Sequence, residues 1–400
     1  MTRRRGHVAR KQTSQGVRYY PVVELPRDPI TSKRQQKWHP YHTSKRAAER
    51  ELTRILGALD QGAYVPPTDR TVAQQLDEHL EALRGNVEDN TLETYRHFTR
   101  AYITPALGTV KLQDLTAGAL KAFYNRLAET GRRHPVKDGP AGGKAGLAPK
   151  TVKHVHGVIY GMLASAVEQG ILTRNVAALK AARPAKVPRI ERRVWEPGSL
   201  RVFLDAMAAD RLAALWQLDA TTGLRRGELL GLPWSAVNLD AGDLAVVQRL
   251  IMVDGKPEIR LGTKTPKSAR RISLDPATVA ALRAHKRRQL EERLAWGEAW
   301  QDHGLVFTRE DGTPLRPAYV SRAFARLAAS AGLPTLTLHG LRHSYATAGL
   351  AAGVPVKVMS ERLGHANTAI TSDLYQHVLP AMDAAAAATV AGLILGGAPR

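Results

Sequence analysis

Side chains suited to phosphate chemistry recur in the last 180 residues of this 400-residue chain. Two guanidiniums can hold the non-bridging oxygens of one phosphate, and two imidazoles can add hydrogen bonds or transfer a proton. A tyrosine can attack phosphorus, but its pKa of about 10 means that it needs a base or cations nearby. A lysine can protonate the departing sugar oxygen. The candidates for these roles are Arg225, Lys264, His339, Arg342, His365 and Tyr375. Together they would break a phosphodiester without a metal and conserve its energy as a phosphotyrosine link.

Each of these residues also has an ordinary structural explanation when it is taken alone. The explanations are a surface ion pair for Arg225 and Glu228, a chance His-x-x-Arg for His339 and Arg342, a helix cap for His365, a core or surface position for Tyr375, and a solvated turn for Lys264. The combination is more informative than any member, because one reaction needs all of these types together.

The common alternatives for phosphate chemistry are missing from the sequence. A nuclease or transposase that works through two metals needs a cluster of carboxylates. Acidic residues are scarce here, 36 against 58 Lys and Arg, and no such cluster stands out. Glycine-rich phosphate-binding motifs are also absent, which argues against the use of ATP. We therefore expect neither a metal nor a cofactor.

Three motifs carry most of these residues. Thr222–Leu229 has the pattern Thr-Gly-Leu-Arg-x-x-Glu-Leu, and His339–Thr347 has His-x-Leu-Arg-His-Ser-Tyr-Ala-Thr. Leu363–His377 contains Leu-Gly-His, then Thr, then Tyr-x-His. In type, spacing and order, the motifs resemble those of the tyrosine recombinase family, phage-integrase branch. The resemblance covers about Ala220 to Val378, with no departure at a catalytic position.

The resemblance implies a role for each position. Tyr375 would be the nucleophile, forming a 3′-phosphotyrosine and freeing a 5′-hydroxyl. Arg225 and Arg342 would clamp the scissile phosphate. His339 would assist the tyrosine as a base, and His365 would hydrogen-bond a phosphate oxygen.

Two further roles follow from the same resemblance. Glu228 would be structural and brace the turn that carries Arg225. The lysine of a β-turn would protonate the 5′-oxygen, and Gly262–Ser268 contains two candidates. We prefer Lys264, which matches the Lys-Thr of the family's turn, and keep Lys267 as the alternative general acid.

The charge balance indicates a polyanionic partner. The chain has a formal net charge of +22 and an isoelectric point near 10.4, so double-stranded DNA is the expected partner, ahead of an acidic membrane surface. The absence of cysteine excludes a disulfide scaffold, a cysteine-ligated zinc or iron–sulfur site and a cysteine nucleophile. No secretory signal is evident, and the most apolar stretch, Ala384–Leu395, is too short to span a bilayer. We expect a cytoplasmic protein with no membrane partner.

Composition and periodicity divide the chain into parts. Residues 1–65 carry fourteen Lys and Arg against five Asp and Glu, and they predict two strands and a helix. Residues 70–180 predict an all-helical domain, 181–198 a charged linker, and 199–400 a mainly helical α/β catalytic domain with a small antiparallel sheet. The fold class is thus multidomain: a small α+β DNA-binding module, an all-α domain and a mixed α/β domain. By resemblance, the first would bind arm-type DNA sites and the second core-type sites.

The favoured interpretation is a site-specific integrase of a phage or other mobile element. It would act as a homotetramer on DNA, with an excisionase or a DNA-bending host factor as a candidate partner. The Ala-rich segment from Ala381 would either dock on a neighbouring subunit or pack on its own domain. The alternatives are a chromosome-dimer resolvase of the same family, a type IB topoisomerase and, from another class, a non-catalytic DNA-binding regulator.

Overall fold

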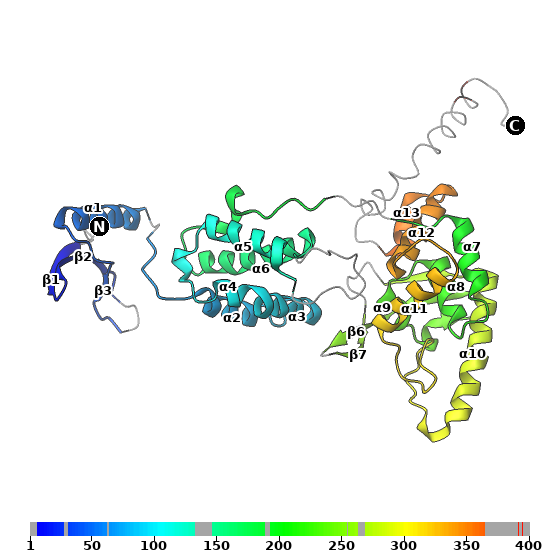
Figure 1. Ribbon diagram of the computed structural model, residues 1–400. Helices are drawn as coiled ribbons and strands as arrows, with labels where there is room; N and C mark the ends of the chain where they lie inside the picture. Colours follow the sequence, from blue (N-terminus) through cyan, green and yellow to red (C-terminus); the bar gives the residue numbers. More distant parts are fainter. Residues whose placement is uncertain are drawn as a thin grey trace. The chain divides into compact units, whose positions relative to one another are not determined.

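The computed structural model divides into two units, Met1–Arg189 and Ile190–Arg400 (Figure 1). The structure describes residues 6–27, 31–61, 64–132, 146–188, 193–253, 255–262, 269–364, 391 and 394. Each unit contains hydrophobic cores of its own. Among the described residues, no helix is long and apolar enough to cross a membrane.

A three-stranded antiparallel sheet and one helix form the first module of the chain. Its elements are β1 (Gly6–Thr13), β2 (Gly16–Leu25), β3 (Gln35–Trp38) and α1 (Lys45–Asp60), with strand order β1-β2-β3. The helix starts after Ser44, whose side chain accepts a hydrogen bond from the Ala47 N–H. Val23 of β2 packs against Ile55 and Leu59 of α1 to make a small core.

The two strands predicted in this module are present as β2 and β3, but the sequence did not predict β1. Its residues are mostly polar, so no hydrophobic alternation marked the strand in the sequence. Every residue of β1 is nevertheless paired with β2, from Gly6 opposite Val23 to Thr13 opposite Gly16. Backbone pairing with a neighbour, rather than a buried side-chain pattern, therefore defines this edge strand.

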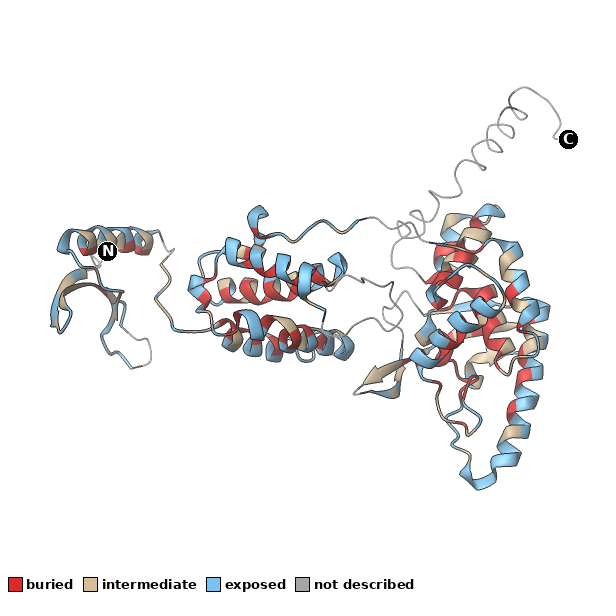
Figure 2. Ribbon diagram, viewed as in Figure 1, coloured by how far each residue is buried: buried red, intermediate tan, exposed pale blue. Residues whose placement is uncertain are grey.

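An all-helical bundle follows, as the sequence predicted. Its elements are α2 (Val72–Ala82), α3 (Asp89–Phe98), a π-helical turn (Thr99–Ile103), α4 (Thr104–Leu107), α5 (Ala117–Thr130), α6 (Pro149–Glu168) and short 3-10 turns at Leu112–Asp114, Val176–Ala178 and Lys180–Ala182. The long helix α6 buries one face in the bundle core (Figure 2). Its Ile159 and Met162 are completely buried, as are Leu76 of α2 and Leu120 of α5.

The second unit combines helices with two small antiparallel sheets, which is the mixed class that the sequence predicted. Its helices are α7 (Pro197–Ala206), α8 (Ala213–Thr222), α9 (Arg226–Leu230), α10 (Pro276–Trp296), α11 (Pro317–Ser330), α12 (Leu338–Ala351) and α13 (Val356–Leu363), with 3-10 turns at Trp234–Ala236 and Gly297–Ala299. Its strands are β4 (Val237–Asn238), β5 (Asp243–Val246), β6 (Gln248–Val253), β7 (Lys256–Leu261) and β8 (Arg270–Ser273). One sheet has the order β4-β5-β8, and β6 with β7 forms a separate hairpin.

The stretch Leu244–Val253 is rich in β-branched and other apolar residues and would be expected from its sequence to form one strand, but the structure divides it between the two sheets. Val247 lies between β5 and β6 and is 45% exposed. β5 pairs with β8, whereas β6 pairs with β7. The segment with both candidate lysines, residues 263–268, therefore connects the hairpin to the first sheet, although these residues lie outside the described part of the chain.

Trp195 attaches the start of the second unit to its core. The residue falls within 181–198, the segment interpreted as a linker. Its indole N–H donates to the Pro334 carbonyl at 2.9 Å, and its ring lies 5.4 Å from Phe203 and 5.5 Å from Phe324. Its backbone N–H donates to the Ser344 hydroxyl of α12, two residues beyond Arg342. Packing of the second unit thus begins before α7.

Candidate active site

A glycine turn between α8 and α9 places Arg225. α8 ends at Gly223, whose φ of 61° lies in the left-handed region that favours glycine. A Cβ at this position would lie 2.7 Å from the ring of Tyr345, so the close approach of α12 also requires glycine. The chain turns there and buries Leu224, and Arg225 becomes the N-cap residue of α9.

Glu228 holds Arg225 in place from one turn along α9. Its carboxylate accepts from the Arg225 backbone N–H at 3.1 Å and from the Arg225 Nη1 at 2.7 Å. It also accepts from Arg270 Nη2 of β8 at 2.9 Å. The side chain of Glu228 is only 6% exposed. Burial favours its neutral form, but the hydrogen bond and charge of Arg270, followed by those of Arg225, hold the pKa of Glu228 below its usual value.

Arg342 of α12 is almost entirely buried, with 2% exposure. Its Nη1 donates to the Gly223 carbonyl at 2.7 Å and its Nη2 to the Leu363 carbonyl at 2.6 Å. Burial, and then the positive charge of Arg225, lower the pKa of Arg342 to about 9. The charged form of this guanidinium is therefore stabilised incompletely by its present neighbours.

The C-terminal turn of α13 is the point where three arginines converge. Arg270 Nε donates to the Arg362 carbonyl at 2.6 Å, Arg342 Nη2 to the Leu363 carbonyl at 2.6 Å, and Arg225 Nη2 to the Gly364 carbonyl at 2.5 Å. The last carbonyls of a helix have no intrahelical partner and carry the negative end of its dipole. They are therefore suitable acceptors for guanidinium groups.

Arg270 was not among the residues singled out from the sequence. It lies on the same face of β8 as Ile272, which is completely buried, because side chains alternate along a strand. The sequence signal that could have indicated a buried Arg270 is its position two residues before an apolar isoleucine in a predicted strand. The adjacent Arg271 lies on the opposite face, is 68% exposed and pairs with Asp243.

The structure brings only part of the expected set together. Arg225, Glu228 and Arg342 share the contacts described above. His339 lies in the first turn of α12 and is exposed, with its ring centroid 4.6 Å from that of His343. The remaining expected residues, Lys264, Lys267, His365 and Tyr375, lie outside the described part of the chain.

The arrangement suits an anion that carries more than one acceptor oxygen. The guanidiniums of Arg225 and Arg270 pair with one ionised carboxylate, that of Glu228, whereas Arg342 donates to two backbone carbonyls. Asp219 of α8 is also near, but burial raises its pKa well above the usual value, and the charge of Arg342 opposes this only in part. Within the described residues, no group of three or more histidine and acidic side chains could hold a metal ion. The positive charge that could bind an anion at this site therefore comes from the arginine side chains.

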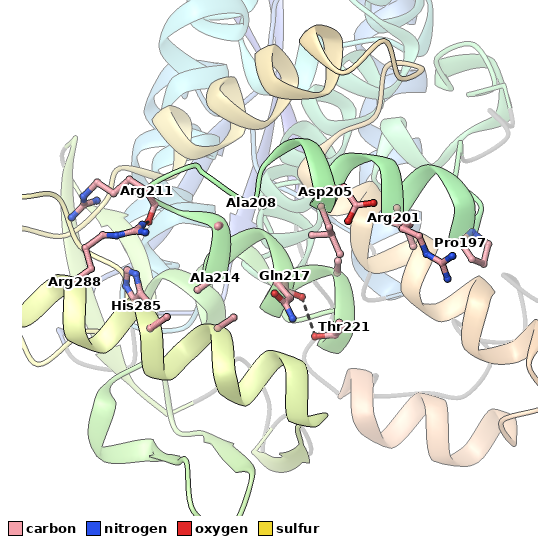
Figure 3. A pocket seen from close by; sticks show the side chains of 16 residues that line it. Pro197, Arg201, Asp205, Ala208, Arg211, Ala214, Gln217, Thr221, His285 and Arg288 are labelled. Carbon is pink, nitrogen blue, oxygen red and sulfur yellow. Dashed lines mark hydrogen bonds between the residues drawn. The ribbon is translucent and has the colours of Figure 1, made fainter.

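A separate groove of about 580 Å³ lies between α7, α8 and α10 (Figure 3). Its lining includes Ala208, Ala214 and Gln217, with Arg211 and Arg288 at one end. Thr221, which also lines the groove, donates its hydroxyl to the Gln217 carbonyl at 2.9 Å. Of the expected catalytic residues that the structure describes, Arg225, His339 and Arg342, none lines this groove, so the phosphate chemistry is not assigned to it.

Two regions of the chain match known family domains. Residues 200–382 match the phage integrase family, and residues 71–128 match the N-terminal SAM-like domain of phage integrases. The curated relatives include a "Tyrosine recombinase XerC-like" protein of Caldanaerobacter subterraneus subsp. tengcongensis, 27% identical over 89% of this chain and 91% of the relative. An integrase of Streptomyces ambofaciens is also 27% identical, over 89% of each chain. The chain belongs to the phage integrase family of tyrosine recombinases.

Solved structures of similar fold support this placement. The Tn1549 transposon integrase in complex with circular intermediate DNA matches with a TM-score of 0.65 and 20% identity, over 80% of this chain and all of that one. A lambda integrase tetramer bound to a Holliday junction matches with a TM-score of 0.56 and 21% identity, over 89% and 92% of the two chains. These similarities establish a shared fold.

Asp219→Asn should stabilise the protein more at neutral pH than in acid. The pKa of Asp219 is higher in the folded protein than in the unfolded chain. Its contribution to the free energy of unfolding is therefore fully present at pH values below the unfolded pKa and is lost as the pH rises through the folded pKa. Asparagine cannot ionise, so the melting temperature of the variant should exceed that of the wild type by an amount that grows from pH 4 to pH 8. Thermal unfolding across this range measures the difference, with Asp205→Asn on an exposed part of α7 as the control. A difference that shrinks with rising pH would mean that Arg342 stabilises an ionised Asp219.

Proposed function

We propose that this protein is an integrase that cuts and rejoins DNA at specific sites through a 3′-phosphotyrosine intermediate. The observation that carries the proposal is the convergence of Arg225 and Arg342 on the last turn of α13. His365 follows that turn directly in the sequence, and Tyr375 lies ten residues further on, inside the region that matches the family.

The proposed cleavage step exchanges one ester for another. The Tyr375 oxygen attacks the scissile phosphorus as its proton passes to His339, and the bond from phosphorus to the 5′-oxygen breaks. Lys264, or Lys267 in its place, gives a proton to that oxygen. Arg225 and Arg342 bind the non-bridging oxygens, where negative charge develops in the transition state. Attack by the 5′-hydroxyl of a second strand reverses the step, so no external energy source is needed.

The guanidiniums must exchange acceptors when DNA binds. In the structure, Arg342 and one nitrogen of Arg225 donate to carbonyl oxygens, which carry only partial charges. A phosphate offers charged oxygens in a geometry that suits two-point binding by arginine. The low pKa of Arg342 supports this exchange, because the incoming negative charge would offset the cost of burying its positive charge.

We propose DNA as the partner of each part of the chain. The relatives of similar fold were solved on DNA, one of them as a tetramer on a Holliday junction. By analogy, this protein would act as a homotetramer, with the helical bundle on core-type sites and the first module on arm-type sites. An excisionase or a DNA-bending host factor would determine the direction of the reaction.

The outer face of the module's sheet supports its proposed role. Lys11 Nζ lies 4.4 Å from the ring centroid of Trp38, and the Arg18 guanidinium lies 4.0 Å from that of Tyr41. Trp38 and Tyr41 remain 42% and 45% exposed. Since α1 covers the other face through Val23, this face presents cations and rings that would contact phosphates and sugars.

Tyr375→Phe should keep DNA binding and lose cleavage, because only the attacking oxygen is removed. The test is a suicide duplex, nicked so that the cut strand diffuses away, built on the attachment core recovered from the DNA flanking the gene. Wild-type protein should form a covalent adduct that survives denaturation, and the Phe variant should bind equally but form none. An adduct in the Phe variant would refute Tyr375 as the nucleophile. Recombination between two sites then separates an integrase from a topoisomerase.

The general acid can be identified by improving the leaving group. A 5′-bridging phosphorothiolate does not require protonation, so it should restore cleavage to the variant that lacks the true acid. We expect rescue of Lys264→Ala and none of Lys267→Ala. Rescue of the Lys267 variant alone would reverse the assignment.

Deletion of residues 1–65 should leave core-site cleavage but abolish efficient recombination between full attachment sites. In the full chain, Lys11→Ala with Arg18→Ala should lower the slope of log affinity against log salt by roughly 1.8, since each phosphate contact contributes about 0.9. Lys45→Ala with Arg46→Ala, on α1, is the matched control and should not change the slope. Equal recombination with and without the module would exclude arm-site binding and favour a two-domain resolvase.

A further inference from the structure

Arg270 is a buried arginine to which the mechanism above gives no role. Its side chain is 7% exposed, and it joins two elements that are far apart in sequence. Nη2 donates to Glu228 at 2.9 Å, next to the start of α9, and Nε donates to the Arg362 carbonyl at 2.6 Å, at the end of α13. One rigid, planar group therefore connects the element that carries Arg225 to the turn that precedes His365.

The close approach of Gly364 shows how tightly this connection is packed. Gly364 has a φ of 64°, and a Cβ there would lie 2.8 Å from Arg270 Nη1. The guanidinium thus lies directly against the residue whose carbonyl receives Arg225 Nη2. A shift of Arg270 would displace both the donor and the acceptor of that hydrogen bond.

Arg270 is also the first residue of β8, the strand that follows the segment containing Lys264 and Lys267. β7 finishes at Leu261 and β8 begins at Arg270, so the chain that carries Lys264 and Lys267 is attached at its far end by this residue. The backbone at Arg270 pairs with Val246 of β5 while its side chain reaches Glu228. Its backbone and its side chain therefore join β5, β8 and α9.

We propose that Arg270 is a positioning residue for DNA cleavage: it holds Arg225 through Glu228 and holds the end of α13 that precedes His365, without touching the phosphate. The proposal rests on the proposed function. Nε and Nη2 of Arg270 donate to two different elements of the site, the end of α13 and the Glu228 carboxylate of α9.

The test compares Arg270→Gln with the wild type in the full-length protein. Single-turnover cleavage of the nicked suicide duplex should slow by about 100-fold, the loss typical of misplaced reacting groups. The Kd for the same duplex should stay within about threefold, because no phosphate contact is lost. Arg271→Gln, one residue along on the exposed face of β8, is the matched control and should cleave like the wild type.

The pH dependence of cleavage separates positioning from a general loss of packing. Three charged side chains face Glu228: Arg270 of β8, Arg225 at the start of the helix that contains Glu228, and Arg342 of α12. Arg270 is the foremost influence that lowers the pKa of Glu228, so its removal should raise that pKa. Protonated Glu228 holds Arg225 less firmly, so the acid limb of the pH–rate profile should move to higher pH in Arg270→Gln and not in Arg271→Gln.

The outcomes distinguish the alternatives. Wild-type cleavage rates in Arg270→Gln, or equal losses of rate and affinity, would overturn the positioning role. If the Gln variant fails to fold, Arg270→Lys tests the positioning role instead. Lysine keeps the positive charge but cannot form both hydrogen bonds that Arg270 makes, to Glu228 and to the Arg362 carbonyl. Slower cleavage with unchanged Kd and melting temperature in that variant supports the proposal, and wild-type rates refute it. If wild-type protein forms no adduct, the proposed function fails, and the role of Arg270 fails with it.

Discussion

The buried carboxylate of Glu228, shared between Arg225 and Arg270, is the interaction on which the arginine cluster of the second unit depends. A buried charge without a partner is strongly destabilising, so this carboxylate requires both cations, and each cation requires it in return. The remaining donors of the arginines are used on the end of α13. Together with the contacts of Arg342, these bonds join α9, β8 and the consecutive helices α12 and α13, which belong to three separate regions of the sequence.

This cluster differs from an ordinary buried salt-bridge network in its charge. Three guanidiniums surround one ionised carboxylate, and helix-end carbonyls complete their hydrogen bonds. Carbonyls satisfy the donors without neutralising them, and the lowered pKa of Arg342 is the consequence. The protein holds these guanidiniums close together with its own groups, and their incompletely compensated charge favours a negatively charged ligand, as electrostatic stabilisation in phosphoryl transfer requires.

The two units use positive charge in different ways. In the first module, Lys11 and Arg18 lie over exposed aromatic rings on an open sheet, where contacts to DNA would be numerous, individually weak and sensitive to salt. In the second unit, Arg342 is buried and its contacts are few and directional. The first arrangement suits binding along a duplex, and the second suits the recognition of one phosphate.

The sequence by itself determined the family, the mixed fold class and the order of the candidate residues. The family and the order of the candidate residues follow from the resemblance of three motifs to a known family, whereas the helices follow from local rules, because an amphipathic helix needs only its own periodicity. The catalytic roles of Arg225, Lys264, His339, Arg342, His365 and Tyr375 remain predictions. Tertiary structure alone decided that β1 is a strand, that Leu244–Val253 is divided, and that Arg270 rather than Arg271 enters the site. The physical reason is that strand pairing and buried ion pairs join residues far apart in sequence, and local composition does not encode which partner each will meet.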